Sequence, residues 1–130
     1  MKDLIFRERV IVMRMWMCDP KILCQKHLCG EHVELHMFIG HLNLKRNING
    51  FIENNLLEPL SIISRHDELM KEMLERGYKH KSPIKEFDLS YLSEEYINHK
   101  IDKVSALKEL ISRCPECGEK LLNLAKIERI

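Results

Sequence analysis

The sequence predicts an all-α protein, a compact single-domain bundle of three to four helices. Its composition is rich in leucine, isoleucine, glutamate and lysine. It holds only 5 glycines, 4 prolines and 6% aromatic residues, a balance that favours helices over sheets. Apolar residues recur at helical spacing in three segments, residues 20–40, 60–74 and 96–111. Helices of this kind bury their apolar faces against one another in a bundle.

The length and charge describe an ordinary globular domain. A chain of 130 residues holds one modest core, and we assign residues 13–130 to a single helical domain. No apolar run approaches the roughly 20 residues of a membrane span, so we expect no membrane partner. We expect a location in the cytoplasm, with reduced cysteines. The net charge of +1 means that contact with nucleic acid must come from a local patch.

Residues 1–12 differ in character from the rest of the chain. A second possible start, Met13-Arg14, comes directly after them, and Arg7-Glu8-Arg9 can be encoded by purine-rich codons where a ribosome-binding sequence would lie. One hypothesis is that residues 1–12 are a leader or a mis-assigned start, and that the protein begins at Met13. The other is that they form a short edge strand or arm. A purine-poor nucleotide sequence over residues 7–9 would exclude the leader.

The first helix is expected from Asp19-Pro20 to Gly40. Aspartate caps helix starts, and proline at the first helical position gives up an N–H that has no partner there. Four side chains, three or four residues apart, share one face of this helix: His27, Glu31, Glu34 and Phe38. Two carboxylates and an imidazole on one face indicate a polar pocket rather than a core stripe.

A second helix is expected from Glu58-Pro59 to Gly77, after a loop or broken helix over residues 41–50. Its apolar stripe faces the core, and four of its residues are expected on a solvated face: Arg65, Lys71, Glu72 and Glu75. Residues 79–83 form a basic loop. A third helix starts at Ser93 as N-cap and runs to about Arg113, and a short final helix covers residues 121–127.

Two clusters have the composition of metal ligands. His32 and His36 lie one helical turn apart, but no glutamate directly follows the first histidine as in a zinc protease, so we expect surface or half-buried histidines. Cys114-Pro-Glu-Cys117 has the spacing of half a zinc knuckle, and only the fold can supply two more ligands. A reduced, partly buried cysteine pair is the interpretation we prefer for it.

Two motifs resemble a known family. Residues 26–35, KHLCGEHVEL, with Phe38 and Gly40 after them, resemble the first helix of the phage endonuclease V family of pyrimidine-dimer DNA glycosylases. Residues 65–78, RHDELMKEMLERGY, are similar to the helix of that family that ends in an Arg-Gly-aromatic motif. The similarity spans about residues 13–83.

The resemblance implies an all-helical DNA-repair enzyme that excises a damaged base and nicks the abasic site, without metal or organic cofactor. By motif and spacing it implies that the α-amine of Met13 is the nucleophile, that Glu34 is the catalytic glutamate and that Arg14 matches the family's neighbouring arginine. Val33 and Met37 stand where better-known members carry DNA-contacting arginines. The expected partner is double-stranded DNA with a lesion or abasic site, bound by a monomer in a bacterial or phage-infected cell.

The chemistry suits these residues. An α-amine has a pKa of about 7.7–8.0, against about 10.4 for lysine, so a useful fraction is unprotonated at neutral pH and can form an imine with the sugar. Glu34 would stabilise the cationic sugar and move protons. His27 would orient Glu34 or the deoxyribose, unless it is a helix-packing histidine. Six cations are expected against phosphates: Arg14, Lys45, Arg46, Arg76, Lys79 and Lys81.

A second function class stays open from the sequence. The chain would then be a non-enzymatic, zinc-stabilised helical module that binds DNA or regulates a partner through the Cys114/Cys117 motif. The enzyme should form a borohydride-trappable adduct with abasic DNA, whereas the module should bind zinc and form no adduct.

Overall fold

The computed structural model describes residues 13–80 and 83–128. Within these ranges the protein is helical and contains no strand, which confirms the predicted fold class. The described elements follow in this order: η1 (Pro20–Ile22), α2 (Gln25–Asn43), α3 (Asn49–Glu53), η2 (Pro59–Ser61), α4 (Ile62–Glu75), α5 (Glu94–Ile97), α6 (Lys103–Arg113) and α7 (Pro115–Glu128). Residues 1–12, the expected leader or arm, lie outside the described residues, as does Lys81.

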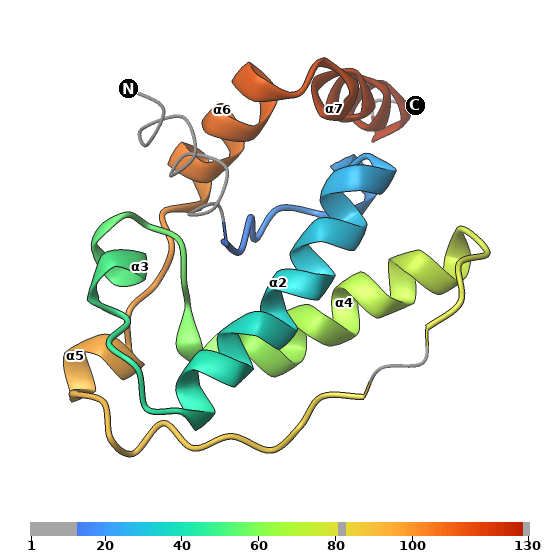
Figure 1. The fold of residues 1–130 in the computed structure, drawn as a ribbon. Helices are drawn as coiled ribbons and strands as arrows, with labels where there is room; N and C mark the ends of the chain where they lie inside the picture. The colour runs from blue at the N-terminus through green and yellow to red at the C-terminus, as the bar shows by residue number, and fades with distance from the viewer. Residues whose placement is uncertain (1–12, 81–82, 129–130) are drawn as a thin grey trace, which may run out of the picture.

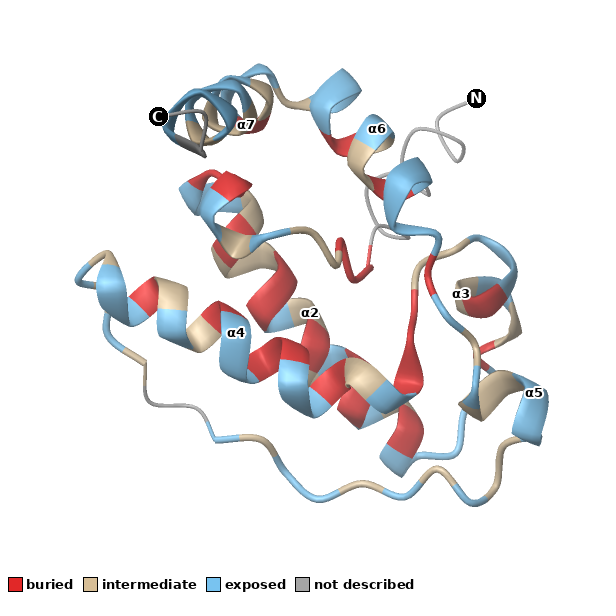
Figure 2. Ribbon diagram, turned by 180° about the vertical axis from the view of Figure 1, so that it is seen from behind, coloured by how far each residue is buried: buried red, intermediate tan, exposed pale blue. Residues whose placement is uncertain are grey.

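Helices α2 and α4 pack across each other at the centre of the molecule (Figure 1). Their facing sides carry most of the buried residues of the pair (Figure 2). The fully buried apolar side chains on these two helices are Leu28, Leu35, Phe38, Leu42, Ile62 and Leu69. Burying each of them contributes about 1.5–3 kcal/mol, so these two helices supply a large part of the apolar core.

The start of α2 differs from the prediction. The Asp19-Pro20 signal is real, because the Asp19 carboxylate accepts a hydrogen bond from the Lys21 N–H at 3.0 Å, but it caps only the short η1 turn. The chain then becomes extended and α2 begins at Gln25, after Cys24, whose side chain makes no capping bond.

The end of α2 was also predicted wrongly. The helix does not stop at Gly40 but continues to Asn43. Leu42, four residues after Phe38, is 1% exposed, and burying it with the core favours continuing the helix. The turn comes at Lys45, which takes a left-handed conformation with φ 53°.

Helix ends elsewhere follow their sequence signals. Gly77 has φ +86° just beyond α4, as the C-terminal signal predicts. Ser93 accepts the Tyr96 N–H at 3.2 Å as the expected N-cap. The third expected helix is nevertheless two helices, because α5 ends at Ile97 and Asp102 caps a new start at α6.

The C-terminal helices α6 and α7 lie over the N-terminal segment and the start of α2. Helix α7 begins at Pro115, earlier than expected, and packs on α6 and on η1. Figure 1 shows it beside the first turns of α2. The incoming chain is buried beneath these elements at Met13, Met15 and Trp16, and the Met15 N–H donates to the Leu56 carbonyl at 2.8 Å. None of the described helices is long and apolar enough to cross a membrane.

Candidate active site

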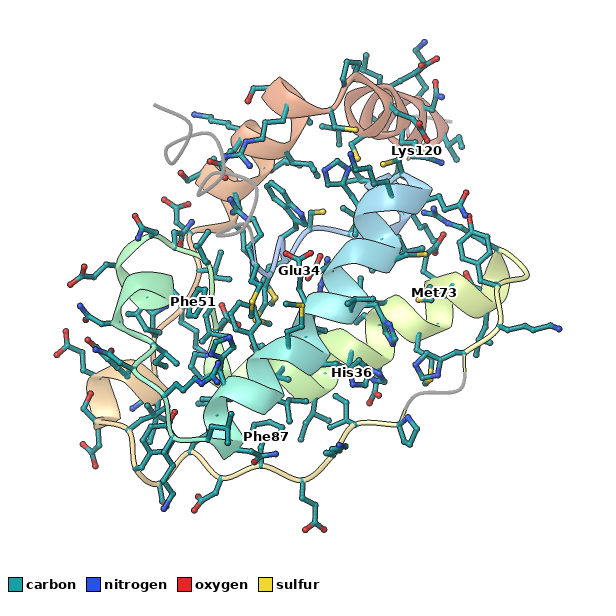
Figure 3. The ribbon with its side chains drawn as sticks, viewed as in Figure 1. Glu34, His36, Phe51, Met73, Phe87 and Lys120 are labelled. Atoms are coloured by element: carbon teal, nitrogen blue, oxygen red, sulfur yellow. The ribbon has the colours of Figure 1, made fainter. Side chains whose placement is uncertain are left out.

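Glu34 projects from the middle of α2 toward the N-terminal segment (Figure 3). Its side chain is half-buried, and its Oε1 accepts a hydrogen bond from the backbone N–H of Arg14 at 2.9 Å. Burial raises the pKa of Glu34 to about 7, helped by the charge of Glu31 and opposed by the Arg14 hydrogen bond and charge. The site therefore holds a carboxyl group that can exchange a proton near neutral pH, next to the peptide group that joins residues 13 and 14.

Met13 and Arg14 are both built into the interior. Met13 is 8% exposed and Arg14 is 3% exposed. The Arg14 guanidinium lies 3.8 Å from the centre of the Trp16 ring and forms an ion pair with Glu109 of α6. Burial, and then the charge of Arg113, lower the pKa of Arg14 to about 10. Arg14 thus joins the segment before η1 to α6, and its guanidinium is covered by protein.

Glu31, one turn before Glu34, has a different environment. It is fully buried and accepts two hydrogen bonds from Arg65 of α4, from Nε at 2.6 Å and from Nη2 at 2.9 Å. Arg65 Nη1 donates to the Cys18 carbonyl at 2.6 Å. The expectation that Arg65 lies on a solvated face was wrong, because this bidentate pair ties α4 to α2 inside the core.

His27 lies among cysteines. Its Nδ1 is 3.1 Å from the Cys24 Sγ and 3.7 Å from the Cys117 Sγ, and its ring lies edge-on to Trp16. Burial, and then Lys26 and Arg113, lower the pKa of His27, which favours the neutral imidazole. The contacts described for His27 are therefore with the thiols and the indole, and none is with Glu34.

Four histidines meet between α2, α4 and the segment after α4: His32, His36, His66 and His80. The Nε2 atom of His32 is 3.2 Å from that of His66 and 2.7 Å from that of His80, and the latter two are 3.3 Å apart. A neutral imidazole Nε2 is either donor or acceptor, so three mutual contacts cannot all be hydrogen bonds. Burial, followed by the neighbouring imidazoles, lowers the pKa of His32 to about 4. The expectation of surface or half-buried histidines fails for His32, which is 7% exposed.

The expected phosphate-binding cations divide into two groups. Lys45, Arg46 and Lys79 are exposed and free to meet a ligand from solvent. Arg76 instead donates to Glu72 at 2.7 Å and to the Leu23 carbonyl at 2.8 Å, so it fastens the end of α4 to the chain before α2. Arg14 likewise already has protein partners, Glu109 and the Trp16 ring. The sequence shows charge but does not show which cations already have partners.

Two groups of described side chains have the spacing of metal ligands. One is Cys24, His27, Cys114 and Cys117, and the other is the four histidines. In each group the ligand atoms lie within 4.8 Å of one another. The sequence points to Cys114 and Cys117 through their spacing, but Cys24 and His27 have no local signal that connects them to residues some 90 positions later.

A family model described as pyrimidine dimer DNA glycosylase matches residues 13–86, more than half of the chain. The chain belongs to this family. The match begins at Met13 and includes Glu34 together with the whole of α2 and α4. No curated protein and no solved structure matches the chain.

Membership confirms the expected class of enzyme. The chain is a DNA-repair protein of the pyrimidine dimer DNA glycosylase family. Membership also decides between the two function classes, since the cysteine cluster by itself does not favour a non-enzymatic module. The Cys114/Cys117 motif lies beyond the matched residues.

Proposed function

We propose that the protein excises a damaged pyrimidine base from double-stranded DNA and then nicks the abasic site, through a Schiff base on the α-amine of a chain that begins at Met13. Membership of the pyrimidine dimer DNA glycosylase family supports the DNA substrate. The lyase step and the roles of individual residues are the content of the proposal.

The observation that carries the proposal is the 2.9 Å hydrogen bond between the Arg14 N–H and the Glu34 carboxylate. It brings the only half-buried glutamate of α2 next to the first residues of the family match. In a chain that starts at Met13, the terminal amine belongs to the residue directly before this hydrogen bond. A nucleophile and a group that accepts protons then share one site.

The first step joins the amine to the sugar. The lone pair of the Met13 nitrogen bonds to C1′ of the deoxyribose as the bond from C1′ to the base breaks, and the base leaves with that electron pair and takes up a proton. The nitrogen loses a proton and then forms a C=N bond to C1′, while the bond from C1′ to the ring oxygen breaks and that oxygen is protonated. The product is a protonated imine.

The second step breaks the strand. Glu34 takes a proton from C2′, the electron pair forms a C2′–C3′ double bond, and the bond from C3′ to its phosphate oxygen breaks. Water then hydrolyses the imine and restores the free amine. The pKa of Glu34 near 7 supports this role, because a general base works best when its pKa is close to the working pH.

The DNA-facing surface lies beside Glu34. Val33 and Met37, one turn apart on α2, are 55% and 46% exposed. Apolar side chains of this kind can wedge between base steps and open a duplex. We assign them this role at positions where better-known members of the family carry arginines. Lys45, Arg46 and Lys79 are the exposed cations that would contact phosphates.

Trapping by borohydride tests the proposal. The Met13 form, translated from Met13, should give a covalent adduct with abasic DNA on reduction and should cleave the strand. The Met1 form has only an amide nitrogen at residue 13, so it should do neither, although it still binds abasic DNA. The difference should be a loss of activity rather than a reduction, because a pathway without its nucleophile is absent.

Selective methylation of the α-amine to a tertiary amine provides the matched control, since it leaves the sequence unchanged and should abolish trapping by the Met13 form. Equal activity of the Met1 and Met13 forms would refute Met13 as nucleophile and direct attention to a lysine, with Lys26 first. Absence of any adduct and of any cleavage from both forms would refute the lyase.

A smaller test addresses the wedge. Met37→Ala should reduce cleavage of intact duplex DNA containing a pyrimidine dimer by about tenfold, the equivalent of about 1.4 kcal/mol of lost contact. Cleavage of an abasic site in single-stranded DNA should stay unchanged, because no duplex has to be opened there. Equal losses on both substrates would mean that Met37 does not act in opening the duplex.

A further inference from the structure

The described chain brings four metal-binding side chains together from its two ends. Cys24 and His27 lie at the start of α2, and Cys114 and Cys117 lie at the start of α7. Both pairs have two residues between their members, the spacing at which two side chains near a helix start can bind one ion. The four ligand atoms lie within 4.8 Å of one another.

Two of the distances between ligand atoms match the edges of a zinc tetrahedron. Zinc–sulfur bonds of about 2.3 Å and zinc–nitrogen bonds of about 2.0–2.1 Å give edges of about 3.8 Å between two sulfurs and about 3.6 Å between sulfur and nitrogen. The Cys24 and Cys114 sulfurs are 3.8 Å apart, and the Cys117 sulfur is 3.7 Å from His27 Nδ1. The Cys24 sulfur is 3.1 Å from the same Nδ1, a contact that an ion would lengthen slightly.

The surroundings suit thiolates. The Cys24 N–H points at the Cys117 sulfur at 3.2 Å, and the Cys117 N–H points at the Cys114 sulfur at 3.4 Å. Backbone donors of this kind stabilise the negative charge of sulfur ligands in metal sites. Cys117 is fully buried and Cys24 is 4% exposed, and the edge of Trp16 lies against the His27 ring. The cluster is thus shielded from water on the sides where its ligands converge.

A disulfide and simple thiol packing both fit this cluster less well than a metal ion does. A disulfide needs its sulfurs about 2.05 Å apart. The Cys24 and Cys114 sulfurs are 3.8 Å apart, and all five cysteines are free thiols. Simple packing of thiols, the interpretation preferred from the sequence, does not require an imidazole nitrogen to converge on the same point. Cys18 and Cys29 are partly buried free thiols that belong to no such group among the described residues, so they are examples of simple packing.

We propose that Cys24, His27, Cys114 and Cys117 bind one structural zinc ion that fastens α7 to the first turn of α2. Four protein ligands close the coordination sphere, so the ion serves the fold rather than the reaction. This site goes beyond the proposed glycosylase activity and replaces the expectation that the chain binds no metal. It adds a crosslink between the family-matched part of the chain and the C-terminal helices that cover it.

The position of the site suggests its purpose. Helix α7 packs on η1, and α6 supplies Glu109, the ion-pair partner of Arg14. A crosslink between residues 24 and 117 therefore holds the C-terminal helices against the segment that carries Met13 and Arg14. Without it, the C-terminal helices are held against the N-terminal segment by the apolar packing around Ala106 and Leu110 and by the Arg14–Glu109 ion pair.

The metal content of the full chain tests the site. The protein, purified with zinc in the medium, should retain about one equivalent per chain that is bound through sulfur. Cobalt substitution should give the intense near-ultraviolet band of thiolate-to-cobalt charge transfer. X-ray absorption at the zinc edge should show three sulfurs at about 2.3 Å and one nitrogen at about 2.0–2.1 Å. These readouts require sulfur, so ions bound to the four histidines do not imitate them.

The matched variants are Cys114→Ser/Cys117→Ser and the control Cys18→Ser/Cys29→Ser. The first should lose the sulfur-bound zinc to below about a tenth of an equivalent and unfold at a lower temperature, while the control should keep both properties. His27→Asn provides a second variant with all thiols intact, and it should weaken zinc binding by at least about tenfold.

Three results would overturn the proposal. The first is a full chain without sulfur-bound zinc when zinc is supplied in excess. The second is equal zinc retention by the Cys114→Ser/Cys117→Ser variant. The third is a disulfide among Cys24, Cys114 and Cys117 in protein isolated under conditions that keep the control cysteines reduced. None of these results is a measurement of borohydride trapping, so the zinc site and the lyase activity are tested independently of each other.

Discussion

Glu31 and Glu34 lie one turn apart on α2, yet the protein treats the two carboxylates in opposite ways. Arg65 reaches Glu31 with two hydrogen bonds and neutralises it inside the core. Glu34 receives one backbone N–H, stays half-buried and has its pKa raised to about 7. The paired carboxylate of Glu31 therefore ties α2 to α4, whereas the raised pKa of Glu34 lets it take up and release a proton near neutral pH.

The largest effect should come from removing the ionisable carboxyl group of Glu34. In the Met13 form, Glu34→Gln should lower strand cleavage of abasic DNA by at least about 100-fold, because glutamine keeps the shape but cannot accept the C2′ proton. The helical circular dichroism should be unchanged. Glu75→Gln, which alters an exposed carboxylate on α4, is the control and should cleave normally. Full activity of Glu34→Gln would remove Glu34 from the mechanism.

Substitution of the buried Glu31 should instead lower the free energy of unfolding. Glu31→Gln leaves the Arg65 guanidinium buried without its counter-charge, which should cost about 3–5 kcal/mol of unfolding free energy in urea denaturation. Glu68→Gln removes only the exposed partner of Arg65 at 3.9 Å, and should cost less than about 1 kcal/mol. Similar losses for the two variants would show that Glu31 and Arg65 do not act as a buried pair.

The raised pKa predicts that Glu34 also opposes folding at alkaline pH. The ordinary pKa of 4.5 applies to the unfolded chain and about 7 to the folded one, so folding favours the protonated carboxyl. That stabilisation is complete below about pH 4.5 and is lost as the pH rises through about 7. In the Met1 form, in which the nitrogen of residue 13 is an uncharged amide, Glu34→Gln should therefore gain stability over the parent between about pH 5 and pH 8.

The size of this gain is modest, because the carboxyl is half-exposed and solvent screens its charge. We expect about 1 kcal/mol, or about 4 °C in Tm, at pH 8 and little at pH 5. Thermal unfolding of both proteins at the two pH values is the measurement. A gain that is the same at both values would mean that Glu34 titrates like an exposed glutamate.

The smallest effect concerns the space next to Glu34. A methyl group on Gly30 would lie 3.5 Å from the Glu34 Oε2, an ordinary contact, whereas one on Gly40 would meet open space. Both glycines lie within α2, so alanine at either should stabilise the helix by about 0.5–1 kcal/mol. Only Gly30→Ala should also slow cleavage, by less than about tenfold, because it shields one side of the carboxylate. Equal activity of the two variants would mean that this side of Glu34 is not used.

Much of the fold could be predicted from local chemistry. The apolar periodicity of residues 20–40 and 60–74 predicted α2 and α4, and Ser93 and Gly77 marked helix ends where the structure has them. Such signals act over a few residues, so they can be read directly from the chain. Gly40 failed as a stop because a more distant interaction, the burial of Leu42 with the core, outweighed the local preference.

For the candidate site, the sequence by itself determined Glu34 and Met13 as the residues to consider, through motifs that the family match of residues 13–86 contains. Only the tertiary structure decided which charges have partners. Arg65 is paired with Glu31 across 34 positions, Arg14 with Glu109 across 95, and Cys24 meets Cys114 across 90. No local pattern encodes such pairs, because their partners are chosen by how α2, α4, α6 and α7 pack. The energy of a charge or a thiol depends on that environment rather than on its neighbours in the chain.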